Sequence, residues 1–362
     1  MNNFEQSLRD LAVGIFTVVS FWFFICLEKM PSFMTLPREV RDQICVEVLL
    51  SPTAVAPDLG LSYNAMIEGR KSYASPETSG LSRECNRIRY QPSASTMVAT
   101  CTSLLLLNHQ LYAETMANLS ITPQSGTYHL DLILLDEILL CPTWLRVPVL
   151  TNNVNQVNVQ LRIAGSHPDN LEEYREVNIG ARSSFAGGDG GPPLIVWQFY
   201  SVLKRFLRVG PTGECQSKPQ HRSVVLKTLD IDVQTPPNID PSHFVQPGSG
   251  RRRSASKDRF SVVDPDYLAR FLTNYIEILL RMDHHTAPYG AIFYNFMNEV
   301  VIRRDGEVVE RMNIASRIPE LAYNNGHPYH PYEGSSEKNL NAFAKWKAST
   351  IKYREERGLQ LP

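Results

Sequence analysis

The sequence predicts an α+β fold, in which a helical N-terminal head packs on a mixed β-sheet with flanking helices. Two observations predict this class. Amphipathic helical segments occur early in the chain, and three segments of alternating apolar residues, separated by helical segments, occur later. Strands separated by helices favour crossover connections within one sheet. The expected organisation is an apolar segment at 1–30, a helical region with a long insertion at 31–120, and an α+β body at 121–362.

The composition narrows the class of protein. With 36 Lys plus Arg against 37 Asp plus Glu, the chain lacks the basic field that attracts nucleic acid, so no nucleic-acid partner is expected. The six cysteines form no Cys-x-x-Cys pair, which argues against a zinc ribbon and favours a reduced cytosolic or nuclear body. The sequence contains no phosphate-binding glycine motif and no hydrolase signature, so no cofactor and no metal are expected.

Residues 11–27 are apolar and uncharged, and they are a candidate transmembrane anchor. As a helix they would be roughly 25 Å long, against about 30 Å for a hydrocarbon core. If the anchor is genuine, the positive charges that follow it keep the body on the cytosolic side of a single-pass protein. Two other interpretations stay open: translation that starts at Met30 or Met34, and a buried helix.

The head is expected to contain two helices. In the first, residues 36–50, apolar positions recur every four residues, Pro37 suits the first turn and Glu39 faces the positive end of the helix dipole. The second, residues 102–119, is expected to begin at a cap on Thr102 or Ser103. Its apolar side comprises Leu104, Leu107, Leu111, Tyr112 and either Met116 or Leu119. Residues 51–98 lack a sustained period and are interpreted as an irregular insertion.

The body is expected to alternate strands and helices. Apolar alternation predicts strands at 127–136, 157–163 and 224–233, and helical spacing predicts helices at 194–209 and 266–282. Asp305-Gly306 lies between two β-rich runs at 300–310, which is a strong hairpin signal. A polar helix at 340–356 closes the chain.

Two loops of low complexity interrupt the body, at 186–193 and 247–259. The second carries three arginines at 251–253, followed by Ser254 and Ser256. Such a basic run is either a solvated, inert loop or a regulatory element, in which Ser254 and Ser256 would accept phosphate.

The two head segments, FMTLPREVRDQICVEVLL and LLLLNHQLYAETMANL, followed by a strand region ending in Trp144 and Pro148, resemble the opening of fungal F-box-like proteins. The triplet Glu39-Val40-Arg41 also resembles a related fungal family named for paired Glu-x-Arg motifs. The resemblance implies that the first helix docks on the Skp-type adaptor of a cullin-RING ubiquitin ligase, while the body selects an unknown target protein. The docking residues that it implies are Leu36, Pro37, Glu39, Val40 and Ile44.

The apolar stripe of this helix has a second interpretation. Leu36, Val40 and Ile44 would then bury against the second helix and form the core of the head, since an apolar stripe is more often core than interface.

Carboxylates on the expected strands suggest one alternative function. Asp230 and Asp232 lie on one face of a strand and Asp131 lies on a possible neighbour, which would suit a metal-dependent hydrolase. Exposure to solvent on the polar side of the sheet explains the same residues. His327 and His330 are expected in a loop without a metal. The leading prediction is therefore a noncatalytic protein-interaction module, with the hydrolase and a membrane-tethered structural protein as alternatives.

Overall fold

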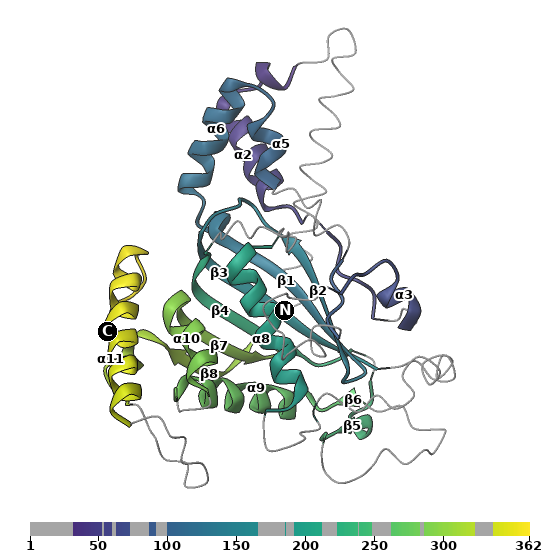
Figure 1. Cartoon of the computed structure of the whole chain (residues 1–362). Helices are drawn as coiled ribbons and strands as arrows, with labels where there is room; N and C mark the ends of the chain where they lie inside the picture. Colours follow the sequence, from purple (N-terminus) through teal and green to yellow (C-terminus); the bar gives the residue numbers. More distant parts are fainter. Residues whose placement is uncertain are drawn as a thin grey trace.

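The protein is an α+β structure with three helices at one end of a mixed six-stranded sheet, as predicted for its class (Figure 1). The computed structural model describes residues 32–52, 54–59, 63–72, 87–91, 100–165, 185, 192–211, 223–237, 239–247, 262–282, 286–322 and 336–362. The strand order is β2-β1-β3-β4-β7-β8. These strands are β1 Thr127–Leu135, β2 Leu139–Arg146, β3 Asn153–Ala164, β4 Val225–Gln234, β7 Met297–Arg304 and β8 Glu307–Asn313.

The four inner strands β1, β3, β4 and β7 run parallel, and the edge strands β2 and β8 are antiparallel to their neighbours. Helix α8 (Leu194–Val209) connects β3 to β4, and helices α9 (Pro265–Leu280) and α10 (Ala287–Phe296) connect β4 to β7. These are the crossover units that the sequence predicts. Because the inner strands follow in chain order and such connections are right-handed, all three helices cover one face of the sheet (Figure 1).

Both hairpins of the sheet turn through residues with positive φ. Asp305 (50°) and Gly306 (86°) join β7 to β8, which confirms the predicted hairpin. Asp136 (54°) and Glu137 (60°) join β1 to β2. This second hairpin is not among the predicted elements, because the apolar runs 132–135 and 138–141 on either side of Asp136 and Glu137 do not alternate with polar residues.

The two faces of the sheet differ in chemistry. Under the helices, Leu130 on β1 pairs in register with Val159 on β3, and Val159 pairs with Ile231 on β4. All three side chains are buried in the main core. The opposite face carries charged and amide side chains along the same strands, and α3 (Tyr63–Ile67) covers its apolar end through Met66.

The head consists of α2 (Arg38–Leu50), α5 (Thr100–Leu105) and α6 (His109–Ile121). The single helix predicted for 102–119 is therefore wrong, since the chain breaks between α5 and α6. The predicted caps Thr102 and Ser103 lie inside α5, and the side chain of Asn108 instead caps α6 by accepting from the Leu111 amide at 2.9 Å. This side-chain bond explains the break, because the Asn108 side-chain oxygen takes the Leu111 amide that a backbone carbonyl would accept in a continuous helix.

The described parts of residues 51–98 are more ordered than the predicted irregular insertion. Besides α3, they form single β-bridges between Lys71 and Tyr90 and between Ile88 and Leu140. Ile88 and Met66 are buried in the two cores. The insertion therefore contributes packing surface as well as chain length.

The C-terminal helix α11 (Ser336–Glu356) packs beside α10 (Figure 1). Arg354 near its end is fully buried and donates to the carbonyls of Tyr294 and Met297 and to that of Gln360. These bonds satisfy carbonyls at the end of α10, where a cation also suits the helix dipole. The remaining short elements are β5 Phe244–Val245, β6 Val262–Val263 and the 3₁₀ turns Phe33–Thr35, Pro123–Gly126, Pro241–His243 and Ala315–Arg317.

Candidate functional site

The structure exposes the apolar stripe of α2. Val40 and Ile44 are each 39% exposed, Pro37 and Glu39 are exposed, and Leu36 at the helix entrance is half-buried. We call Leu36, Val40 and Ile44 the α2 apolar face. The interpretation in which this face forms the core of the head is therefore wrong.

A different stripe of α2 packs into the head. Arg41, Cys45 and Leu49, again spaced by four residues, are the buried residues of the helix, and Leu49 belongs to the main core. Burial also raises the pKa of the Cys45 thiol, which favours its neutral form. The helix thus has two stripes, of which one contains an arginine and is inside.

An ion pair explains this orientation. The Arg41 guanidinium donates to both carboxylate oxygens of Glu114 on α6, at 3.0 and 2.5 Å, and both side chains are 8% exposed. The hydrogen bond from Arg41 lowers the pKa of Glu114 to about 2, so the carboxylate is ionised at neutral pH. Gln110 adds a third donor to Glu114 at 3.0 Å. Such bidentate pairs are strong and geometrically specific.

Further contacts fix the position of α2. The third nitrogen of the Arg41 guanidinium donates to the Leu36 carbonyl, and Asn118 on α6 donates to Asp42 at 3.0 Å. At the other end of the helix, Arg146 on β2 donates to the Leu50 carbonyl at 3.2 Å. The α2 apolar face is therefore presented by a helix that is held along its whole length.

Other apolar side chains of the head are also exposed. Leu106 and Leu107 at the break between α5 and α6 are 79% and 64% exposed, and Tyr112 and Met116 on α6 are partly exposed. Leu107 and Tyr112 belong to the predicted apolar side of 102–119, and both are exposed. The break after α5 turns that stretch outward, and a continuous helical period could not reveal it.

Asp131 and Asp230 are paired with arginines and Asp232 is half-buried, so solvent exposure does not explain these carboxylates. Asp131 is fully buried and accepts from Arg162 at 2.5 and 2.8 Å, while Asp230 accepts from Arg303 at 2.9 and 3.0 Å. Burial raises the pKa of Asp131, and the Arg162 guanidinium opposes that rise.

The geometry of these carboxylates does not suit one shared ion. Asp131 and Asp232 both align with Gln160 of the strand between them, which puts them two strand spacings apart, roughly 10 Å. Within the described ranges, no three His, Cys, Asp or Glu side chains gather closely enough to hold a metal ion. The metal-dependent hydrolase stays a prediction that none of these contacts supports.

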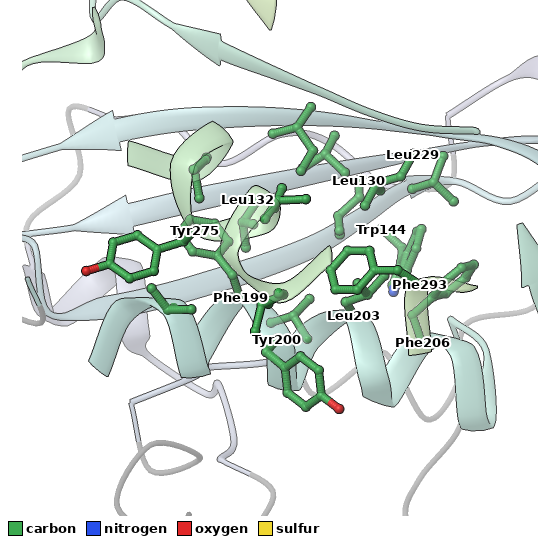
Figure 2. A pocket seen from close by; sticks show the side chains of 18 residues that line it. Leu130, Leu132, Trp144, Phe199, Tyr200, Leu203, Phe206, Leu229, Tyr275 and Phe293 are labelled. Atoms are coloured by element: carbon green, nitrogen blue, oxygen red, sulfur yellow. The ribbon is translucent and has the colours of Figure 1, made fainter. Parts of the chain in front are cut away.

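An apolar cavity of about 90 Å³ lies between the sheet and its covering helices (Figure 2). Its wall is almost entirely hydrocarbon, and the hydroxyl groups of Tyr200 and Tyr275 point away from the space. Burial raises the pKa of the Tyr200 hydroxyl to about 12. In a core, a void of this size costs about 2 kcal/mol at roughly 24 cal/mol per Å³. A hydrocarbon group that fills it would recover part of that free energy.

The remaining predicted site residues, Ser254, Ser256, His327, His330 and the candidate anchor at 11–27, lie outside the described residues. No helix in the described ranges combines the length and the apolarity of a membrane span.

Comparison of the chain with family models, with curated proteins and with solved structures gives no match.

Proposed function

We propose that the protein is a noncatalytic protein-interaction module, in which α2 docks on a Skp-type adaptor and the body recognises a target protein for a cullin-RING ubiquitin ligase. The observation that carries the proposal is the exposure of Val40 and Ile44 on a helix whose other face is buried. The choice of adaptor rests on the resemblance of 31–165 to fungal F-box-like proteins.

The α2 apolar face suits binding in a groove of a partner. Val40 and Ile44 lie about one turn apart on one side of α2, and Leu36 lies in extended backbone just before the Pro37 N-cap. In this mode of recognition, apolar anchors at helical spacing supply most of the affinity. Glu39 and Arg38 are exposed beside them and provide the polar rim that such interfaces have.

Pre-organisation strengthens the proposal. Arg41 fixes α2 against α6 through Glu114, and Arg146 ties the end of α2 to the sheet. A helix that is already formed and held loses little conformational entropy when a partner binds.

The test measures binding of the full-length chain to a purified Skp-type adaptor by titration calorimetry. Val40→Glu and Ile44→Glu, separately, should weaken binding at least tenfold, because each puts a charge into an apolar contact. Both positions are partly exposed, so the unfolding midpoint should stay within about 2 °C of that of the wild type.

Val308→Glu is the matched control, since Val308 is 48% exposed on the edge strand β8, far along the sheet from the head. It should bind the adaptor as the wild type does. Wild-type chain that does not bind the adaptor, or variants that bind it unchanged, would refute the proposal. Loss of the folded state in Val40→Glu and Ile44→Glu would show that the face belongs to the core.

A further inference from the structure

The cavity under α8, α9 and α10 is the strongest feature that the proposed function does not use. Apolar and aromatic side chains of the sheet and of these helices line it, among them Trp144, Val159, Phe199, Tyr200, Leu203 and Tyr275. The lining comes from the neighbouring strands β2, β1, β3 and β4 and from three helices, so the cavity lies between this part of the sheet and the helices that cover it.

The chemistry of the wall selects the ligand. No charged or amide side chain contributes to it, and the two tyrosine hydroxyls are directed away (Figure 2). A ligand with a polar group inside this wall would lose hydrogen bonds to water and gain none. A hydrocarbon group has no such penalty.

The size of the cavity narrows the ligand further. An engineered cavity of about 150 Å³ in another protein, lined by the same kinds of side chain, binds benzene. A space of about 90 Å³ suits a single ring or a short alkyl group. Phe199 and Leu203 on α8, Tyr275 on α9 and Trp144 on β2 are half-buried members of the lining, so the cavity comes nearest to solvent at these residues.

We propose that the body of the protein binds a small hydrocarbon group, either a free aromatic molecule or the end of an acyl chain, in the cavity between the sheet and α8, α9 and α10. The site is separate from the α2 apolar face. Failure of adaptor binding would therefore leave this inference untouched, and the reverse also holds.

The test titrates benzene into the full chain and follows heat and the intrinsic tryptophan fluorescence, to which Trp144 in the cavity wall contributes. Benzene should bind saturably and raise the unfolding midpoint. Phenol is the matched ligand, because it has nearly the same size and adds one hydroxyl; it should bind at least tenfold more weakly. Octanoate distinguishes the two kinds of ligand. Octanoate that binds, and that binds more weakly to the cavity variants, indicates an acyl chain. Protein that binds benzene but not octanoate indicates a free aromatic molecule.

Two variants connect binding to the cavity. Val159→Leu enlarges a side chain of the cavity floor and Leu203→Trp enlarges one at its rim, so each should weaken benzene binding at least tenfold. If Val159→Leu does not fold, Leu203→Trp still tests whether benzene binds in the cavity. Val308→Leu makes the same chemical change on exposed β8 and should bind normally. Wild-type protein that does not bind benzene, phenol that binds equally well, or a folded cavity variant with unchanged affinity would overturn the inference.

Discussion

Replacing Asp131 by alanine should destabilise the protein strongly, because it leaves a buried arginine without its partner. Asp131 is fully buried, and the Arg162 side chain that donates two hydrogen bonds to it is 16% exposed. Removing one member of a buried pair costs about 3–5 kcal/mol. The residual exposure of Arg162 lets water solvate part of the charge, so we expect the lower end, about 3 kcal/mol.

Urea unfolding at pH 7, followed by far-ultraviolet circular dichroism, measures this free energy. Asp232→Ala is the control on the same face of the sheet, since Asp232 is half-buried and accepts a hydrogen bond from the Gly306 amide at 2.9 Å. It should cost about 1 kcal/mol or less. The double change Asp131→Leu with Arg162→Leu should recover much of the loss, because apolar replacement of a whole buried pair is often neutral.

Two results would contradict this prediction: a loss of under about 1 kcal/mol in the free energy of unfolding of Asp131→Ala, or a double variant that is less stable than Asp131→Ala. Either result would mean that the pair of Asp131 and Arg162 does not carry the stability that its burial indicates. Recovery of the Asp131→Ala variant by the double change would instead show that the carboxylate has a structural role.

Three further predictions concern the head, the packing of α9 on α10 and the C-terminal helix. Folding lowers the pKa of Glu114 to about 2, so the pair with Arg41 stabilises the head fully above the ordinary glutamate pKa of 4.5. This stabilisation is lost as the pH falls toward 2. Hydrogen exchange of the α2 amides should therefore become faster over this pH range in the wild type and not in Glu114→Gln. Gly290→Ala should cost about 1–3 kcal/mol or more, since its Cβ would lie 2.1 Å from the Leu279 carbonyl, and an unchanged midpoint in urea would contradict that clash. Arg354→Lys should cost about 2–4 kcal/mol because an ammonium cannot reproduce the fork of bonds to backbone carbonyls; protease resistance of 336–362 equal to that of the wild type would argue otherwise.

The sequence predicts β1, β3, β4 and the β7–β8 hairpin, together with the connecting helices α8 and α9, but not the β1–β2 hairpin. Alternation in 127–136 and 157–163 identifies strands because a two-residue period has one interpretation when one face is buried. The helix over 194–209 was found equally well, since its apolar residues recur with the helical period.

The candidate docking face could be named from the sequence, but its exposure could not. The hydrophobic pattern of α2 predicts that Val40 and Ile44 are buried and that Arg41 is exposed, because it considers the hydrophobicity of each residue by itself and not its partners. The Glu114 partner of Arg41 is 73 residues away along the chain. Its contribution reverses the orientation of the helix, and only the folded arrangement reveals it.

The cavity has a different reason for being hidden. Each lining residue is an ordinary core residue in an ordinary strand or helix, and the space depends on how closely α8 and α9 approach the sheet. Sequence periodicity indicates which side chains face inward and gives no measure of the volume that they leave.

The connection between the head and β1 has a mechanical consequence. Helices α2 and α6 both run toward the sheet, and α6 continues through the 3₁₀ turn Pro123–Gly126 directly into β1 (Figure 1). Gly126 lies close to Asn155 on β3: a Cβ at position 126 would lie 2.6 Å from the side-chain amide nitrogen of Asn155. The Pro123–Gly126 turn also contacts α2 and β3, and Arg146 on β2 donates to the Leu50 carbonyl at the end of α2, so contacts at two places hold the head against the sheet. A molecule bound to α2 would therefore keep one orientation relative to the sheet. Two molecules, one bound to the head and one to the body, would then face each other in one defined orientation.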